Sequence, residues 1–563
     1  MTLFKQFILF CCLQLILPVE ASAQIQPIWQ VTYERIENGT NTKSGLSLIY
    51  HDSLVYLSQP EDKIQQFIDY RTNAIVSILQ FEDDLYKNVT PSGKLPMPVL
   101  ESNPDKILGY TCNYASYDYF SNKIEVWFTT DTPAKGSPYS NFIPDVDALV
   151  LKILINGNRE IVATSIQKLS DFKLPEYPAD KAFAVTDAEF EELKINSRFQ
   201  RLPVFTEEMV NFDPTIKTVV KELQSDTTYR FSKGSVILKK VRLTPEMIQS
   251  GNVFVKLHCR SNGDAYDRTG SVFMISEGEG ISVLDAYLKG LDQLPVYIDH
   301  QGNKYQGIHK EENYQPPIEL MRFFTSFGAG HFNDKRQINN YPWAGDVMYK
   351  QEVTPLIPSE TQDIWVGVFI GNYDKGGHIV SLELDFYPDF NEEANSMEKF
   401  ILPLFSTINT LEMSGQNYGR LFNNDTLRVE FQLPENVTEI NLLYTSTGHG
   451  GWGDGDEFNP KLNQVFIDGN AIFSFIPWRT DYATYRLSNP ASGNFDNGLS
   501  SSDLSRSNWC PGTLTPPCII PLKNLNPGNH LLEVMIDQGT DEGDSFNHWC
   551  VTGVLTGKIK LTK

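Results

Sequence analysis

The sequence predicts an all-β fold assembled from antiparallel sandwiches. Strand-like segments with turn residues at short intervals dominate the chain, and few stretches carry a helical period. Apolar and polar residues alternate in three clear runs, at 252–259, 378–387 and 426–433. Each run predicts a half-buried antiparallel strand with one face on a core, which is typical of sandwiches and jelly rolls.

The other expected elements are one helix and a few shorter strands. The helix is expected at 187–196, where Phe190, Leu193 and Ile195 interleave with acidic residues, and a connector is expected after it, at 201–214. Shorter apolar segments bounded by polar or glycine-rich loops predict strands at 272–275, around 440–444 and at 465–467.

The first 23 residues have the pattern of a secretory signal peptide. Lys5 precedes an apolar run at 7–17, and Ala21-Ser22-Ala23 forms an A-x-A cleavage site before Gln24. No later segment approaches the apolar length of a spanning helix. We therefore expect export to the periplasm or the cell exterior, without a membrane anchor.

The chain of 563 residues is too long for one core and predicts several domains. Shifts in composition divide the exported chain into a strand-rich first region at 24–212, a second block at 213–391 and a third block at 392–563. A ligand site between the second and third blocks is a reasonable expectation, since such sites often lie between domains.

Charge and cysteine content exclude some classes of partner. The 47 basic and 70 acidic residues give a formal net charge of −23, which argues against nucleic acid. Five cysteines follow the signal peptide, an odd number that leaves at least one thiol outside any internal disulfide. Cys510 and Cys518, which flank a compact Pro/Gly-rich loop, are the pair most suited to a disulfide.

Standard catalytic and metal motifs are absent from the sequence. It contains no H-E-x-x-H, no G-x-S-x-G and no P-loop, and its histidines lack zinc-ligand spacing. We therefore expect no metal and no cofactor. One glycine-rich loop, at 448–460, carries the aromatic and acidic residues Trp452, Asp454, Asp456 and Glu457. Three interpretations stay open for this loop: a solvated turn, a loose calcium site, or a working carboxylate on a rigid scaffold.

Two further loops carry residues suited to chemistry or sugar binding. Tyr266-Asp267-Arg268 precedes the strand expected at 272–275, and alone it predicts no more than a surface ion pair. Arg506 and Trp509 share a loop near Cys510. An indole ring stacks on sugar C–H surfaces and a guanidinium donates paired hydrogen bonds, but a tryptophan that plugs the loop into the core explains the pattern equally well.

Taken together, these loops resemble the peptide-N-glycosidase F family of bacterial amidases, which release N-linked glycans from asparagine. The resemblance covers residues from about 213 to the C-terminus and rests on three motifs in order. It implies two adjacent eight-stranded antiparallel jelly rolls, preceded here by the strand-rich first region, with the active site between the rolls. The motifs are Cys259…Tyr266-Asp267-Arg268, Gly448-His449…Glu457 and Arg506-x-x-Trp509-Cys510-Pro511-Gly512.

The resemblance also implies roles for individual residues. Asp267 matches the principal catalytic aspartate and Glu457 the glutamate from the second jelly roll. A further family glutamate falls at Ile370 and a neighbouring tryptophan at Asn372, so Asp374 is the candidate for a third acid. The substrate-binding residues implied by the same motifs are Tyr266, Arg268, His449, Trp452, Arg506 and Trp509.

The first region resembles a different family, the GLPGLI domains. Ile107–Cys112, the 127–130 strand and Pro138-Tyr139 carry the likeness, while the signature itself is degraded at 142–147. We expect this region to be an accessory module that alters access to the site.

The resemblance implies an exported, monomeric amidase that hydrolyses the Asn–GlcNAc linkage of N-glycoproteins and converts Asn to Asp. Asp267 would act as acid/base at the linkage, Glu457 would hold water and substrate, and the two arginines would fix the carboxylates. An endoglycosidase that cuts between sugars and a non-catalytic N-glycan-binding protein remain the alternatives.

Overall fold

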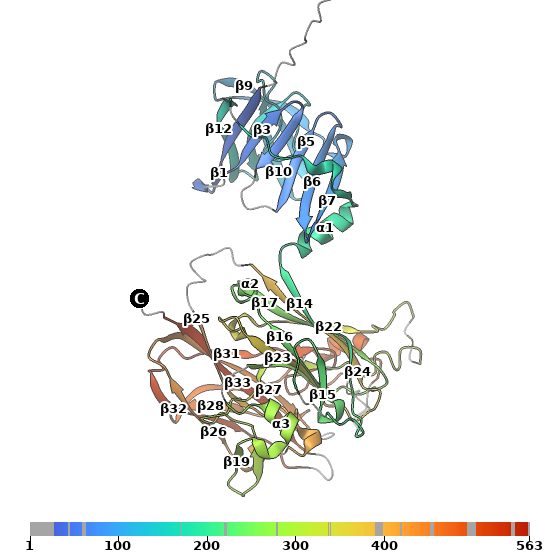
Figure 1. Cartoon of the computed structure of the whole chain (residues 1–563), viewed down its shortest axis with the longest axis vertical. Coiled ribbons are helices and arrows are strands. Elements are labelled where there is room, and N and C mark those ends of the chain that lie inside the picture. The colour runs from blue at the N-terminus through green and yellow to red at the C-terminus, as the bar shows by residue number, and fades with distance from the viewer. Residues whose placement is uncertain are drawn as a thin grey trace, which may run out of the picture. The chain divides into compact units, whose positions relative to one another are not determined.

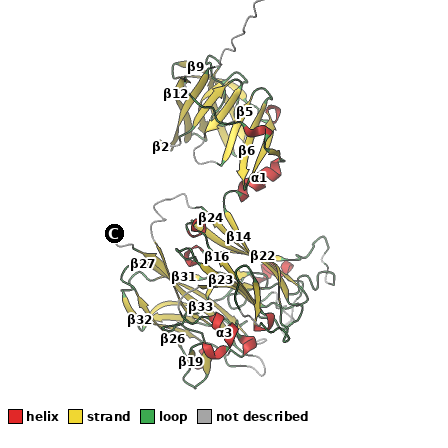
Figure 2. Cartoon of the chain, in the orientation of Figure 1, coloured by secondary structure: helices red, strands yellow, loops and turns green. Residues whose placement is uncertain are grey.

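The computed structural model describes residues 27–42, 45–58, 63–170, 172–218, 222–276, 280–335, 337, 339–388, 398–416, 419–450, 455–491, 501, 503–541 and 546–560. Strands dominate these residues and helices are few and short, which confirms the all-β prediction (Figure 2). The expected signal peptide, the 391/392 boundary, Trp452 and Asp454 lie outside the described residues. No helix in the described ranges is long and apolar enough to cross a membrane.

The chain forms two compact units, Met1–Ser197 and Arg198–Lys563. The first unit, blue to cyan in Figure 1, is one large, mainly antiparallel sheet whose apolar faces enclose a core. In spatial order its strands are β13 (Phe183–Ala184), β7 (Asp84–Pro91), β6 (Ala74–Phe81), β5 (Ile64–Asp69), β4 (Leu54–Ser58), β3 (Ser47–His51), β1 (Ile28–Glu37), β12 (Arg159–Leu169), β11 (Leu149–Ile155), β10 (Asn122–Thr129), β9 (Tyr110–Tyr119) and β8 (Val99–Ile107), with β2 (Thr40–Thr42) paired to β1.

The expected helix is present as α1 (Asp187–Asn196), and it begins with a capping box. Thr186 accepts a hydrogen bond from the Glu189 N–H, and the Glu189 side chain accepts one from the Thr186 N–H. The connector expected at 201–214 is wrong over most of its length, because Gln200–Val210 forms strand β14. The boundary expected near residue 212 accordingly lies after Ser197 instead.

The second unit begins with a sandwich of two antiparallel sheets. Val255 and Leu257 on one sheet and Val366 and Val368 on the other bury their side chains in the same core. This is the outcome that the alternating pattern predicts. The first sheet contains β14, β24 (His378–Tyr387), β17 (Asn252–Ser261) and β22 (Val347–Glu352); the second contains β15 (Thr228–Phe231), β16 (Val236–Arg242), β23 (Asp363–Ile370), β18 (Thr269–Ser276), β21 (Ile318–Phe324) and β30 (Leu514–Thr515).

A second antiparallel sandwich follows in the same unit. One of its sheets contains β25 (Glu398–Ser406), β33 (His548–Ile559), β27 (Val437–His449) and β31 (Cys518–Pro521); the other contains β26 (Leu427–Leu433), β32 (Gly528–Ile536), β28 (Asn463–Ile467) and β29 (Asn470–Phe475). Short elements outside the two sandwiches include α2 (Pro245–Ile248), α3 (Val283–Lys289), α4 (Leu421–Asn424), β19 (Val296–Ile298) and β20 (Lys304–Gln306), besides several one- or two-turn 3-10 helices.

A buried ion pair joins the two sandwiches. Arg322 on β21 binds Glu319 through two hydrogen bonds of 2.7 and 2.9 Å. Its Nη1 also donates to the Thr447 hydroxyl on β27 and to the Cys550 carbonyl on β33, while the Thr552 hydroxyl donates to Glu319. Every partner is buried, so these contacts hold the two sandwiches in one relative position.

Candidate active site

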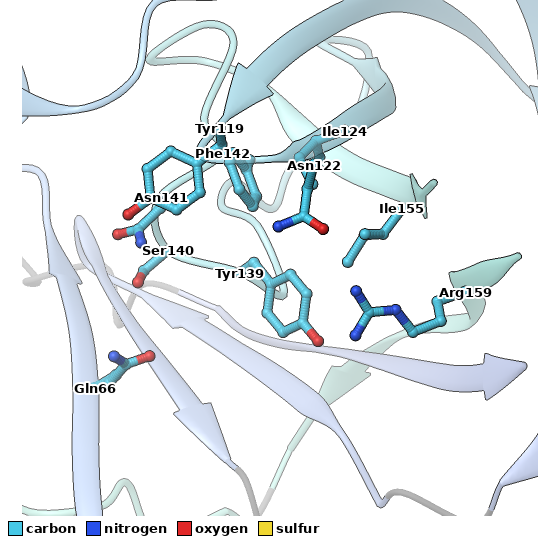
Figure 3. A pocket seen from close by; sticks show the side chains of 10 residues that line it. All are labelled: Gln66, Tyr119, Asn122, Ile124, Tyr139, Ser140, Asn141, Phe142, Ile155 and Arg159. Atoms are coloured by element: carbon cyan, nitrogen blue, oxygen red, sulfur yellow. The ribbon is translucent and has the colours of Figure 1, made fainter. Parts of the chain in front are cut away.

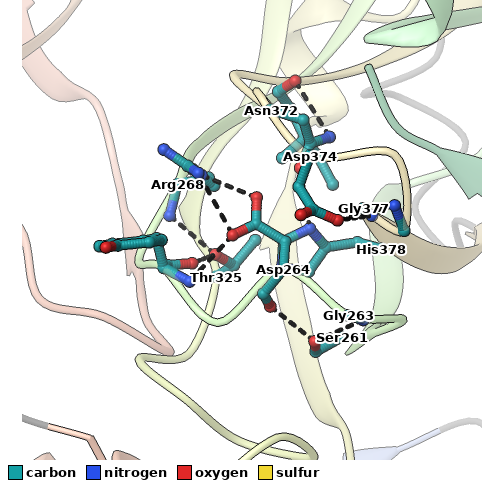
Figure 4. A network of polar contacts seen from close by, with 12 residues as sticks. Ser261, Gly263, Asp264, Arg268, Thr325, Asn372, Asp374, Gly377 and His378 are labelled. Atoms are coloured by element: carbon teal, nitrogen blue, oxygen red, sulfur yellow. Dashed lines mark hydrogen bonds and ion pairs between the residues drawn. The ribbon is translucent and has the colours of Figure 1, made fainter. Parts of the chain in front are cut away.

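The residues on both sides of Asp267 are held by hydrogen bonds. Asp267 lies on the loop between β17 and β18. Asp264, only 2% exposed, accepts a hydrogen bond from the Tyr266 N–H at 3.0 Å. It also accepts two hydrogen bonds from the Arg268 guanidinium, at 2.8 and 3.2 Å (Figure 4). The Thr325 hydroxyl accepts the Arg268 N–H at 2.8 Å and donates to the Tyr266 carbonyl at 2.9 Å. Asp267 therefore sits on a rigid loop.

Glu457 lies on the loop between β27 and β28, which a buried carboxylate anchors. The neighbouring Asp456 accepts hydrogen bonds from the Trp549 indole at 2.8 Å and from the Gly539 N–H at 3.0 Å, and Lys461 lies 3.5 Å from it. Asp456 is fully buried and so supports the loop. The side chain of Glu457 remains 19% exposed.

Arg506 joins the two predicted catalytic carboxylates. Its guanidinium is 2% exposed, and Nη1 donates both to Asp267 Oδ2, at 3.1 Å, and to Glu457 Oε1. The backbone of Arg506 is fixed by two hydrogen bonds with Arg479. Three aromatic rings lie within cation–π distance of its guanidinium: Trp509 at 4.5 Å, Tyr482 at 4.6 Å and Phe458 at 5.0 Å.

The pair of carboxylates sits where ionisation costs more than in water. Burial raises the pKa of Asp267, and the Arg506 guanidinium opposes that rise. Burial also raises the pKa of Glu457, and the Arg506 guanidinium again opposes that rise. The charge of the adjacent Asp267 raises this pKa further, to about 7. One of the two acids therefore changes charge near neutral pH, as acid–base chemistry at that pH requires.

His449 and Trp509 lie beneath this site as buried side chains. His449 shares a 2.9 Å hydrogen bond with the Thr447 hydroxyl, and its ring stacks on His548. The Trp509 indole donates to the Gly448 carbonyl at 2.9 Å, and its ring stacks on Phe324 at 4.5 Å. Tyr266, by contrast, is 60% exposed beside Asp267.

Asp374, the candidate for a third acid, and the positions Ile370 and Asn372 have no described contact with Asp267 or Glu457. Ile370 is fully buried in the core, and Asn372 is buried with hydrogen bonds to the Val210 carbonyl and to His378. Asp374 Oδ1 accepts the Gly376 N–H at 2.7 Å and therefore caps the turn before β24 (Figure 4). The structure thus gives Asp374 a local structural task.

The disulfide expected between Cys510 and Cys518 is not formed, since both residues are free thiols. Cys510 is buried next to Trp509. The chain then crosses to the first sandwich, where β30 pairs with β21, and returns at Cys518 to pair with Tyr444 on β27. The loop therefore spans two sheets instead of closing on itself.

Three potential metal ligands meet through strand pairing, which sequence spacing does not reveal. His449 lies opposite His548 in the β27–β33 ladder, and their ring nitrogens and the Cys550 thiol lie within 4.8 Å of one another. Burial lowers the pKa of His449 most, and the neighbouring His548 lowers it next. The buried guanidinium groups of Arg322 and Arg506 lower this pKa further. These guanidinium groups oppose a bound cation, so the cluster is a poor metal site.

A pocket of about 300 Å³ lies in the first unit and contains none of these residues (Figure 3). Tyr119, Tyr139, Asn122 and Arg159 are among its lining residues, which include no carboxylate, imidazole or thiol. The lining therefore lacks a pair of groups for acid–base chemistry.

Three protein-family models match parts of this chain. Family models described as "Peptide-N-glycosidase F, N terminal" and "Peptide-N-glycosidase F, C terminal" match residues 201–386 and 417–556. A model described as "N-glycanase peptide, N-terminal domain" matches residues 57–188. The likeness of that region to GLPGLI domains stays a prediction.

The solved structures of PNGF-II agree with the family models. The structure of PNGF-II in space group P21 is 39% identical, with a TM-score of 0.83, and the match covers 95% of this chain and 100% of that one. The C2 form of PNGF-II gives 39% identity, a TM-score of 0.78, and coverage of 95% and 99%. PNGase F from Flavobacterium meningosepticum is 14% identical over 64% of this chain and 96% of that one, with a TM-score of 0.42.

No curated protein matches the chain. The chain belongs to the peptide-N-glycosidase F family, and it is a protein of the glycoamidase type.

Several residues of the site could not be found from local sequence. Asp264 has a weak signal, because it lies four residues before Arg268 in a polar loop. Thr325 and Tyr482 have none, since each acts on a residue that is distant in the chain.

Proposed function

We propose that this protein is an exported amidase that hydrolyses the Asn–GlcNAc linkage of N-glycoproteins and glycopeptides. The observation that carries the proposal is that one guanidinium nitrogen, Arg506 Nη1, binds a carboxylate from each sandwich, Asp267 and Glu457. The pKa values of both carboxyl groups are raised, and both groups bind the same fixed guanidinium. A carboxylate can then accept a proton from water while the guanidinium polarises the amide.

The geometry suggests a division of labour between the two acids. Glu457, with a pKa near 7, is the better base for a water molecule at mildly alkaline pH, because it accepts a proton more readily than an ordinary carboxylate. Water oxygen bonds to the amide carbon, its proton passes to Glu457, and the C–N bond then breaks. Glu457 returns that proton to the linkage nitrogen, so the glycosylamine leaves as a neutral amine and the peptide keeps a carboxyl group. Asp267 contacts the linkage nitrogen, and Arg506 holds both acids in register.

This division predicts the pH dependence of the reaction. Glu457 must be ionised to take a proton, so kcat/KM is expected to rise with pH through an apparent pKa near 7 and to fall below it. Glu457→Gln is expected to lower kcat/KM by about 10²–10⁴-fold. Its residual activity should lack the limb near pH 7, as measured by initial rates on one glycopeptide across pH. An unchanged limb in this variant would exclude Glu457 as the titrating group.

An endoglycosidase is the second candidate function. In inverting enzymes the two carboxyl groups lie roughly 6.5–9.5 Å apart to leave room for water. Here Asp267 and Glu457 bind the same nitrogen, which brings their nearest oxygens closer than that. The spacing therefore disfavours inversion but leaves a retaining mechanism open.

Product analysis of one digested glycopeptide separates the candidates. The amidase leaves Asp at the former Asn and releases an intact glycan. An endoglycosidase leaves a sugar on an unchanged Asn, and a non-catalytic glycan-binding protein leaves the glycopeptide intact.

Export is a further part of the proposal, and it rests on the sequence at 1–23. Expression of the full chain in a bacterium with a periplasm is expected to yield a mature protein that begins at Gln24. Mass analysis of the secreted or periplasmic fraction provides the measurement. A recovered protein that retains Met1–Ala23 and stays in the cytosol would contradict it.

A further inference from the structure

The pocket in the first unit has no part in the proposed reaction. Its volume of about 300 Å³ is at the lower end of the range for ligand pockets, so it has room for a small molecule. Its lining joins strands that are distant in the sheet, since Gln66 lies on β5 and Tyr119 on β9 (Figure 3). The pocket therefore lies on the concave side of a curled sheet.

Part of the lining is aromatic and held in place before any ligand arrives. Phe142, only 5% exposed, packs in the core of the unit. Tyr119 and Tyr139 make T-shaped contacts with its ring, with centroids 5.5 and 6.5 Å away. The Arg35 guanidinium donates a hydrogen bond to the Tyr139 hydroxyl at 3.0 Å. Because both tyrosines remain half-buried, their rings can stack on the apolar C–H surface of a sugar.

Three amide side chains in the lining have unused hydrogen-bonding capacity. The side-chain amides of Gln66 and Asn141 have no described hydrogen-bond partner. Asn122 Oδ1 accepts a hydrogen bond from the Asn156 amide at 2.7 Å, which leaves the NH₂ group of Asn122 available to a ligand. Amide groups both donate and accept, so they suit the hydroxyl and acetamido groups of a sugar.

Among the lining residues, Arg159 alone is charged. Its guanidinium points toward Tyr139 (Figure 3) and has no described hydrogen-bond or ion-pair partner. Glu37 lies opposite Arg159 in the β1–β12 ladder, but no ion pair joins the two in the described structure. A planar guanidinium that is unpaired, in a lining without carboxylates, suits the two oxygens of a ligand carboxylate.

We propose that this pocket binds an acidic sugar, a hydroxylated ring that bears a carboxylate. The aromatic side chains contact the C–H face of the ring, the amides bind its hydroxyl groups, and Arg159 binds its carboxylate. None of the lining residues belongs to the Asp267–Glu457 site. The first unit therefore has a binding function of its own, which does not depend on the proposed reaction.

The test titrates the full chain with two matched ligands and follows their binding by ligand-observed NMR. One ligand is the methyl α-glycoside of N-acetylneuraminic acid, and the other is the methyl ester of the same compound, which lacks only the negative charge. The acid is expected to bind saturably. The ester is expected to bind roughly tenfold more weakly, because it loses a charge-assisted pair of hydrogen bonds. Neither ligand carries an asparagine linkage, so turnover does not interfere.

Three variants locate the binding. Arg159→Gln is expected to bind the acid as weakly as the ester, and it should keep the wild-type unfolding temperature because Arg159 is exposed. Lys168→Gln is the matched control, since it removes an exposed positive charge near the other end of β12, roughly 30 Å away, and should keep the preference for the acid. Tyr119→Ala removes part of the aromatic lining and is expected to weaken both ligands alike.

Several results would overturn the proposal. If the wild type binds neither ligand at millimolar concentration, or binds both equally well, the pocket is not a site for an acidic sugar. A preference for the acid that survives in Arg159→Gln, or that is lost in Lys168→Gln, removes Arg159 as the group that binds the carboxylate. Unchanged binding of both ligands by Tyr119→Ala places the binding outside this pocket.

Discussion

Asp267→Asn is expected to lower kcat/KM for glycan release by about 10²–10⁴-fold with little loss of stability. The amide keeps the shape of the carboxylate and its hydrogen-bond reach to Arg506, but it no longer carries the charge beside the linkage nitrogen. Arg506 stays paired with Glu457 in this variant, so no buried cation is left alone. Initial rates on a glycopeptide and a thermal unfolding curve provide the two measurements.

Asp346→Asn supplies a matched control for this prediction. The Asp346 side chain is 60% exposed in the same unit, and His258 is its described ion-pair partner, at 3.4 Å. Its replacement is expected to leave both the rate and the unfolding temperature near the wild-type values. Near-normal turnover by Asp267→Asn would remove Asp267 from the reaction.

Arg506→Met is expected to abolish activity and to destabilise the second unit as well. Removing the guanidinium leaves Asp267 and Glu457, 17% and 19% exposed, facing each other without a cation. Breaking a buried pair in this way costs about 3–5 kcal/mol. The cost depends on pH, because protonation of either carboxylate relieves the repulsion, so the loss of unfolding free energy is expected to be larger at pH 8 than at pH 5.

Arg506→Lys separates charge from geometry at this position. Lysine keeps a positive charge but lacks the planar fork that reaches both acids, Tyr482 and the Ser501 carbonyl. It should recover part of the stability lost in Arg506→Met and little of the activity. If Arg506→Met is as stable at pH 8 as the wild type, Arg506 does not hold the two acids together.

Local pattern predicts elements well in this chain and long-range contacts poorly. The helix at Asp187–Asn196 and the strand at His378–Tyr387 have the predicted bounds, because their signals lie within a few consecutive residues. The connector at 201–214 was wrong because Val204, Phe205 and Val210 bury their side chains only after β14 pairs with β24, a strand more than 160 residues away.

The same limit applies to the site. The three loops that carry Asp267, Glu457 and Arg506 stand out in composition, but only the fold brings Arg506 to Asp267 across 239 positions. The disulfide expected between Cys510 and Cys518 failed for the same reason, since nothing in that loop signals that its middle pairs with β21. The pocket that Gln66, Tyr139 and Arg159 line likewise has no local signature.

The central claim is that this site hydrolyses the amide linking glycan to asparagine. It is tested most directly by digesting a glycopeptide in ¹⁸O-labelled water with the wild type and with Asp267→Asn, followed by mass analysis of the peptide. The account predicts that the wild type yields Asp carrying one ¹⁸O in its side-chain carboxylate and that Asp267→Asn yields almost none. An unlabelled peptide that retains a sugar on Asn, or equal labelling by both proteins, would contradict it.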